Sequence, residues 1–168
     1  MFIATDTHRY VGKVVGSGQC MALVQLVDPG VPHSSKLRQG IKVRGADLPP
    51  GTVIATFNSE GRYDNKTDGS SHIAILLEQL DDGLRVVDQW VLHPVAERII
   101  RFKAGAGPAC DDGDRFCVVE AVVDHRQPKP VLGLTGPIRL HLDGSFEAGN
   151  GLPIVLISVL TQARQMQE

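Results

Sequence analysis

The first regular pattern of apolar positions spans residues 19–27, where they recur at the spacings of one helix face. Gly16 and Gly18 come just before it, and glycine supplies the backbone freedom that a tight turn into a helix requires. Segment 28–32 holds two prolines and a glycine, which end a helix. The pattern therefore predicts a short, mostly buried helix that begins at Cys20.

Runs of β-branched and aromatic residues predict an antiparallel sheet after this helix. Segment 52–57 is typical of a strand, and segment 72–78 is so continuously apolar that we expect it to be covered on both faces. Asp81-Asp82-Gly83 predicts a hairpin turn, with 84–90 as the returning strand. The polar stretch 58–71 is expected to be an exposed loop. Further strand candidates are residues 98–102 and 116–123.

The composition changes after Lys103, where small residues and an acidic turn interrupt the chain. From residue 124 onward short apolar runs alternate with Pro/Gly turns, and Asp143-Gly144 is a strong hairpin signal. We therefore expect a helix-and-sheet domain over residues 1–123 and a β-rich extension over residues 124–168 that is packed on the same domain.

Composition and charge restrict the kind of partner. The chain has 168 residues, 42% of them hydrophobic and 21% charged, with a net charge of −2. No concentrated basic patch is visible, which argues against nucleic acid or an anionic membrane as the main partner. No apolar run reaches the ~20 residues of a membrane span. The N-terminus has neither the basic region nor the apolar core of a signal peptide, so none is expected.

The cysteine and histidine spacings indicate no metal site. Three cysteines are an odd number, and no CxxC pair is present. Cys110 and Cys117 could pair in an oxidising compartment, although reduced thiols are the favoured interpretation. Gly16-Ser17-Gly18 lacks the further glycine and the preceding strand of a dinucleotide site. We therefore expect neither a metal nor a cofactor.

Three reactive side chains fall where the predicted elements meet. Cys20 lies at the helix start, where unpaired N–H groups favour the nucleophilic thiolate. His72 begins one strand of the hairpin and Asp88 lies near the end of the other, so antiparallel pairing makes them neighbours. A carboxylate on the far nitrogen holds an imidazole in the tautomer that accepts a proton. If the helix crosses the sheet, Cys20, His72 and Asp88 form a nucleophilic triad.

Each of these residues also has a purely structural interpretation. Cys20 is compatible with a buried helix-end cysteine, and His72 with a histidine hydrogen-bonded inside the core. Asp88 is compatible with a solvated carboxylate at a strand end. Their joint placement on a hairpin of matching register favours the triad.

These stretches resemble the papain-like amidases of the CHAP and NlpC superfamily. Residues 18–24 are similar to the Gly-Gln-Cys helix start of that family, and residues 71–76 to its histidine strand. Residues 86–90 are similar to the strand with the third polar residue, and residues 48–57 to the strand before the histidine. The resemblance covers roughly residues 10–102 and is best among the compact amidases that bacteria deliver to rivals by type VI secretion.

The resemblance implies an α+β papain-like fold, in which an N-terminal nucleophile helix packs on an antiparallel sheet. It implies hydrolysis of amide bonds in peptidoglycan stem peptides, with Cys20 as nucleophile, His72 as base and then acid, and Asp88 orienting His72. The backbone N–H of Cys20 would be one oxyanion donor, with Gln19 supporting that loop. Many relatives have Asn where this chain has Trp90, so Asp88 would orient His72 alone.

We expect a substrate groove beside the triad. The alternative is that its candidate residues are exposed loop residues without a function. Its candidate residues are Gly18, Arg62, Tyr63, Ser71 and Trp90.

The resemblance also implies the partners: a peptidoglycan peptide and a cognate immunity protein. The enzyme would act in the periplasm of a target bacterium after delivery by a secretion apparatus. Two other function classes stay open, a non-catalytic β-rich binding or adaptor protein on the same scaffold and a thiol-dependent acyltransferase. The sequence does not indicate an oligomeric state.

Overall fold

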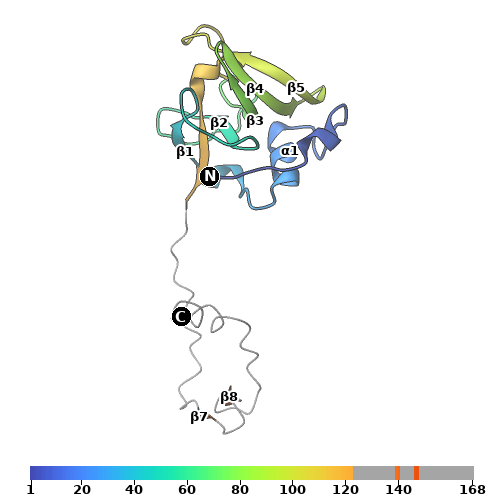
Figure 1. Cartoon of the computed structure of the whole chain (residues 1–168), viewed down its shortest axis with the longest axis vertical. Helices are drawn as coiled ribbons and strands as arrows, with labels where there is room; N and C mark the ends of the chain where they lie inside the picture. Colours follow the sequence, from blue (N-terminus) through green and yellow to red (C-terminus); the bar gives the residue numbers. More distant parts are fainter. Residues whose placement is uncertain (123–138, 141–145, 148–168) are drawn as a thin grey trace. The chain divides into compact units, whose positions relative to one another are not determined.

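A computed structural model describes residues 1–122, 139–140 and 146–147 of the chain (Figure 1). By its contacts the chain divides into two compact units, Met1–Val123 and Asp124–Glu168. The first unit contains every residue of the predicted triad, so the account below concerns that unit.

The second unit contains a short strand pair. Strands β7 (Arg139–Leu140) and β8 (Phe146–Glu147) are antiparallel, which agrees with the hairpin signal between them. The remaining strands expected in residues 124–168, and the turn at Asp143-Gly144, lie outside the described residues.

Six strands of the first unit form one antiparallel sheet in the order β1-β6-β2-β3-β4-β5 (Figure 1). The predicted α+β architecture is thereby confirmed, and five of the six strands overlap predicted segments. The strands are β1 Leu37–Lys42, β2 Val53–Thr56, β3 Ile73–Leu80, β4 Gly83–Trp90, β5 His93–Arg101 and β6 Phe116–Ala121.

Strand β1 has no counterpart in the sequence prediction. It lies at an edge of the sheet, and only Leu37 of its six residues is buried. An edge strand with one covered residue shows no alternation of apolar and polar positions, so its pattern is that of a polar connection.

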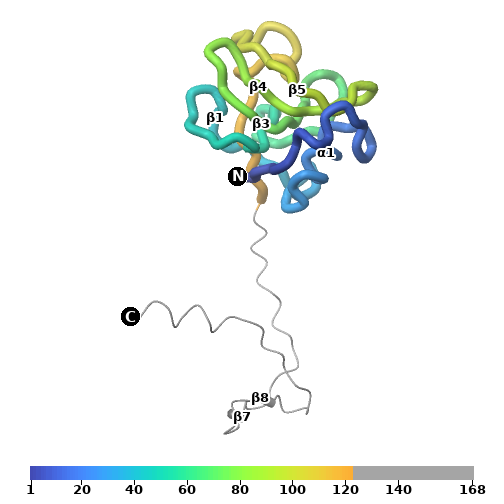
Figure 2. Tube along the Cα trace, turned by 45° about the vertical axis from the view of Figure 1, so that its right-hand side comes forward, coloured from blue at the N-terminus to red at the C-terminus, as the bar shows by residue number. Residues whose placement is uncertain are grey.

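Helix α1 (Cys20–Val27) begins at the residue that the sequence predicts. It buries Met21, Leu23 and Val24, and it contacts β3 and β4. The cartoon and the tube trace both show it beside that part of the sheet (Figures 1 and 2). The helix that begins at Cys20 therefore packs on the sheet, as expected. Short 3-10 helices cover Thr7–Tyr10, Ser34–Lys36, Ala109–Asp111 and Gly113–Arg115.

Apolar side chains cover both faces of the sheet. On the face toward α1, Ile73, Ile75 and Val87 join a core with Leu23 and Val24. The other face forms a second core, with these buried members: Val43, Ile54, Ala74, Leu76, Leu84, Val86, Ile100, Phe116 and Val118. The first four residues of β3 are thus buried on both sides, as the continuous apolar run predicts.

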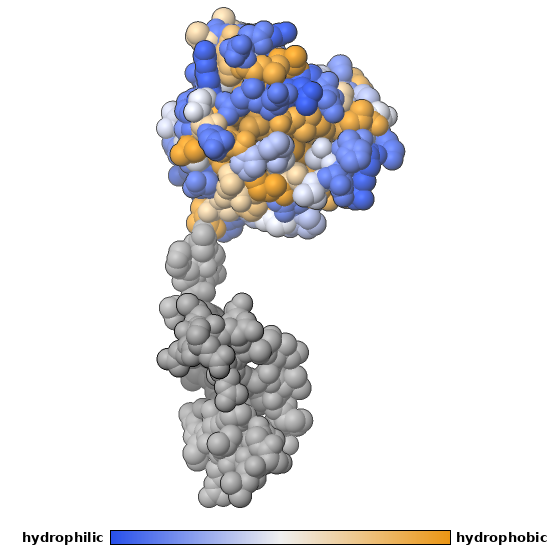
Figure 3. All heavy atoms as spheres, in the orientation of Figure 1, coloured by the Kyte–Doolittle hydropathy of each residue, from blue (hydrophilic) through white to orange (hydrophobic). Residues whose placement is uncertain are grey.

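The surface of the first unit combines polar side chains with an apolar band on the face drawn in Figure 3. At the turn between β4 and β5, Leu92 is 94% exposed and adopts a positive φ of 69°. Among residues 1–122, 139–140 and 146–147, no helix has the length and apolar character to cross a membrane.

Candidate active site

The loop that leads into α1 is held by Gln89 of β4. This side chain is fully buried and accepts a hydrogen bond from the Val15 N–H (3.1 Å). It also donates to the carbonyl oxygens of Val15 and Gln19, at 2.9 Å each. Because Gln19 is the residue just before α1, Gln89 fixes where the helix begins and so where Cys20 lies.

Two glycines give this loop its path. Gly16 and Gly18 have φ values of +55° and +76°, a region that side chains disfavour. A Cβ atom on Gly16 would lie 2.8 Å from the Cβ of Ala22 in the first turn of α1. The close approach of loop and helix therefore depends on Gly16.

His72 and Asp88 meet across the β3–β4 hairpin, as the sequence predicts. Nε2 of His72 lies 2.7 Å from Oδ2 of Asp88, and the two residues are 5% and 0% exposed. His72 immediately precedes β3, so its ring lies at the end of the sheet, near the start of α1. Its second nitrogen, Nδ1, is not engaged by Asp88, and the imidazole lies near enough to the Cys20 thiol to lower the pKa of that thiol.

Asp88 has a second partner that the sequence analysis did not include. Nε of Arg98, on β5, donates to the same Oδ2 at 2.8 Å. The guanidinium lies over the Trp90 ring, 4.9 Å from its centroid, and Nη1 donates to Asp111 at 3.2 Å. Arg98 thus holds the carboxylate of Asp88 in place, while Asp88 is the residue whose side chain contacts Nε2 of His72.

Cys20 has the surroundings of a nucleophile. Burial alone would raise the pKa of its thiol, but the hydrogen bond and charge of His72 lower it, with help from Tyr63 and the Ile73 N–H. The net result is a pKa below the ordinary value of 9.0. These are the conditions in which cysteine forms a thiolate beside an imidazolium.

The same contacts act on His72 in the opposite direction. Burial alone would lower the pKa of its imidazole, but the hydrogen bonds to Asp88 and Cys20, and their charges, raise it to about 9. A histidine with a raised pKa beside a cysteine with a lowered one favours the ion pair over the neutral pair.

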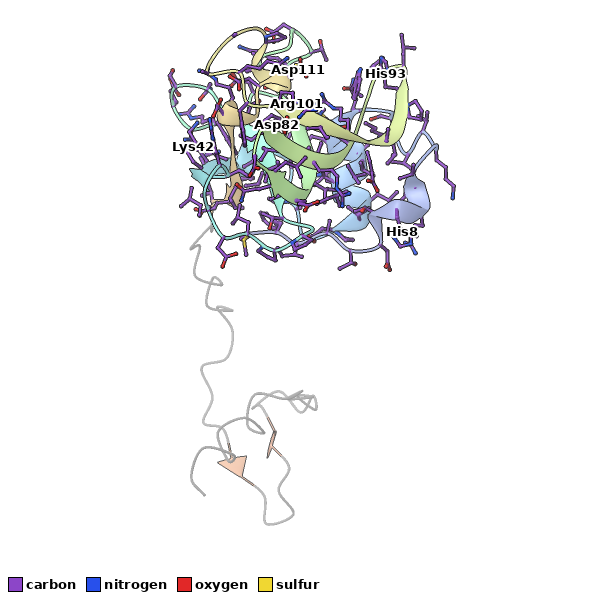
Figure 4. The ribbon with its side chains drawn as sticks, turned by 45° about the horizontal axis from the view of Figure 1, so that its top comes forward. His8, Lys42, Asp82, His93, Arg101 and Asp111 are labelled. Atoms are coloured by element: carbon purple, nitrogen blue, oxygen red, sulfur yellow. The ribbon has the colours of Figure 1, made fainter. Side chains whose placement is uncertain are left out.

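A cavity of about 550 Å³ opens onto the sulfur and the imidazole. Cys20, His72 and Gln19 line it, together with Ser71 and Trp90 from the five residues proposed for the groove. Its other lining residues come from loop 58–71, from β5 and its turn, and from segment 104–115: Lys66, Thr67, Gly69, Val91, Arg98, Pro108, Cys110 and Asp111. Figure 4 labels Asp111 at the upper edge of the first unit.

Three residues proposed for the groove lie outside this lining, and Asp88 lies behind His72. Gly18 belongs to the turn before α1, and Arg62 points into solvent beside Glu60. Tyr63 is only 5% exposed. The expectation that loop 58–71 is exposed is therefore wrong at this residue. Its hydroxyl lies 3.5 Å from the sulfur of Cys20.

All three cysteines of the chain are free thiols in the described part. Cys117 is buried in β6, and Cys110 lines the cavity. Over the same described residues, no group of three His, Cys, Asp or Glu side chains is arranged to hold a metal ion.

Comparison with known proteins assigns the chain to a family. Residues 2–119 match the model of the family described as domesticated amidase effector 2. The chain is 40% identical over 106 residues to a type VI secretion amidase effector 2 protein of Salmonella typhi, a match that covers 60% of this chain and 77% of that protein. It is 38% identical over 82 residues to domesticated amidase effector 2 of Ixodes scapularis, covering 49% and 54%.

A solved structure supports the same assignment. The type 6 secretion amidase effector 2 (Tae2) superposes with a TM-score of 0.62 at 28% identity, covering 75% of this chain and 99% of that one. The chain therefore belongs to the domesticated amidase effector 2 family and is, like the type VI secretion amidase effectors that it matches, an amidase with a papain-like fold.

Proposed function

We propose that this amidase hydrolyses amide bonds in the peptide stems of bacterial peptidoglycan, with Cys20 as nucleophile. The observation that carries the proposal is that Cys20 and His72 line one cavity, with Asp88 hydrogen-bonded to His72 behind it. The amidase effectors that the chain matches support the reaction class. His72 is the acid and base, and Asp88 orients it.

In the first half of the reaction, the Cys20 thiolate attacks the amide carbonyl carbon. The imidazolium of His72 gives its proton to the amine as the C–N bond breaks, which leaves a thioester on the enzyme. His72 then removes a proton from water, and the hydroxide attacks the thioester. The products are a free amine and a carboxylate, and the thiolate–imidazolium pair is restored.

The start of α1 supplies a place for the oxyanion. The first N–H groups of a helix have no carbonyl partner within it, and they carry partial positive charge. The N–H of Cys20 is the first of these, and Gln89 donates a hydrogen bond to the adjacent carbonyl of Gln19. We therefore propose the Cys20 N–H as an oxyanion donor and Gln19 as loop support.

The proposed substrate determines where the enzyme acts. We propose that this enzyme is secreted into a target bacterium and acts on the peptidoglycan in its periplasm. A bacterium that produces it needs a specific inhibitor to protect its own wall. We therefore expect a cognate immunity protein as a partner. From the sequence pattern we also propose that residues 124–168 are a β-rich addition to the amidase domain of residues 1–123.

The test is to digest purified peptidoglycan and identify the fragments by mass. We expect fragments with one new amine and one new carboxylate, and no release after iodoacetamide has modified the peptide that contains Cys20. Intact peptidoglycan would contradict the proposal and favour the binding or adaptor alternative. Fragments joined to an added amine would identify an acyltransferase instead.

The pH dependence of kcat/KM is expected to be bell-shaped. Activity needs the thiolate, so it rises with pH through the pKa of Cys20, which lies below 9.0. Activity also needs the imidazolium, so it falls as the pH rises through the pKa of His72, about 9. Asp88→Asn removes the charge that raises the pKa of His72, so the alkaline limb should move down by about one pH unit or more.

Asp82→Asn is the matched control for that measurement. Asp82 is an exposed carboxylate that pairs with Arg101 at the far end of the same hairpin, and Figure 4 shows the two side by side. This variant should keep the wild-type profile. An alkaline limb that stays in place in Asp88→Asn would show that Asp88 does not control the protonation of His72.

A further inference from the structure

The contact between Tyr63 and the nucleophile has no assigned role in the triad. The Tyr63 hydroxyl lies 3.5 Å from Sγ of Cys20, within hydrogen-bonding distance for sulfur. The ring is almost fully buried and meets Phe57 edge-on, with 6.4 Å between the ring centroids. A fixed, buried phenol therefore faces the sulfur from a different element than His72 does.

The direction of this hydrogen bond follows from the charges. A thiolate has no proton to give, so in the ion pair the phenol must donate. Burial raises the pKa of Tyr63, and the neighbouring Cys20 raises it further, so the phenol keeps its proton throughout the working range of pH. Tyr63 is a permanent neutral donor, whereas the contribution of His72 is lost when the imidazole loses its proton.

The loop that carries Tyr63 also borders the substrate cavity. Lys66, Thr67, Gly69 and Ser71 line that cavity a few residues further along the chain. Asn58 braces the loop, because its side chain accepts hydrogen bonds from the N–H groups of Glu60 and Arg62 and donates to Asp64. The hydrogen bonds within loop 58–71 thus keep the Tyr63 hydroxyl near the sulfur of Cys20.

We propose that Tyr63 is a further catalytic residue, whose hydroxyl donates a hydrogen bond to the Cys20 sulfur and holds it as the thiolate. The inference rests on the proposal that Cys20 is the nucleophile. The other groups that face the sulfur are His72, with Asp88 behind it, and the Ile73 N–H. The remaining charged groups of the cavity are Lys66, Arg98 and Asp111.

The test is the alkylation of Cys20 by iodoacetamide as a function of pH, followed by the mass of the Cys20 peptide so that Cys110 and Cys117 do not contribute. Tyr63→Phe removes one oxygen and keeps the ring against Phe57. We expect the pKa of Cys20 to rise by about one unit, which lowers alkylation several-fold on the acid side. At high pH the rate should equal or exceed that of the wild type, since a thiolate of higher pKa is more nucleophilic.

Tyr10→Phe is the matched control, because Tyr10 is the only other tyrosine of the chain and its hydroxyl accepts from Arg9. It should leave the profile unchanged. Replacement of both tyrosines by 3-fluorotyrosine, a more acidic phenol and stronger donor, should shift the pKa of Cys20 downward. This second measurement does not require the Phe variant to fold.

Two results would overturn the inference: a Tyr63→Phe profile identical to the wild type, or a rate lowered by one factor at every pH, which indicates a displaced sulfur. Alkylation needs no peptidoglycan. A protein that leaves peptidoglycan intact but shows the expected profiles would therefore refute the proposed substrate and preserve the role of Tyr63.

Discussion

Replacement of Cys20 by alanine is expected to lower the rate of amide hydrolysis by about 10⁵-fold or more, because no other group can form the thioester. The loss should be in kcat, since the cavity walls that bind the substrate are unchanged. Cys20 is only partly buried, so removal of its sulfur should cost less than about 1.5 kcal/mol in the free energy of unfolding. The measurements are kcat on a stem peptide and a urea denaturation curve.

Cys117→Ala provides the matched control. Cys117 is buried in β6, away from the cavity lining, and burial raises the pKa of its thiol. The variant should lose stability through the vacated volume and keep the rate of hydrolysis. Hydrolysis by Cys20→Ala at more than about one hundredth of the wild-type rate would exclude the covalent mechanism, because no route without the nucleophile approaches that rate.

The central pair of the site could be predicted from the sequence because its geometry is local. Sixteen positions separate His72 and Asp88 along the chain, and one tight turn determines which residues of a hairpin face each other. The helix start at Cys20 could also be predicted from the sequence, because it depends on two nearby glycines and an apolar pattern.

The rest of the site depends on contacts that no local pattern reveals. Arg98 reaches Asp88 from β5, and Gln89 reaches back to the loop at Val15. The available signals were a glutamine inside one predicted strand and an arginine at the start of the next. Neither indicates a partner, because the partner depends on how the sheet and the helix pack together.

Tyr63 is the clearest example of a site contact that the local sequence pattern does not reveal. Its loop is polar and rich in turn residues, which is typical of an exposed connection. The structure buries this one aromatic side chain against Phe57 and the sulfur of Cys20. The single aromatic residue of this polar loop therefore faces the interior, whereas the sequence analysis had placed it in the substrate groove.

Replacement of His72 by alanine is expected to lower kcat/KM by about 10³- to 10⁴-fold, because the amine then leaves without a proton from a positioned acid. The same change should raise the pKa of the Cys20 thiol, since His72 supplies the largest contributions that lower it. Iodoacetamide labelling of Cys20 near neutral pH should therefore slow markedly. The two measurements together distinguish loss of the acid–base group from general damage to the fold.

His93→Ala tests whether the effect belongs to His72 or to any histidine beside the cavity. His93 stacks on Trp90 with 4.2 Å between the ring centroids, and Trp90 in turn meets the His72 ring edge-on at 6.2 Å. Its loss should leave the labelling profile of Cys20 unchanged. If His72→Ala also left that profile unchanged, the sulfur would be ionised by another group, and a thiolate–imidazolium pair could not be the basis of this amidase.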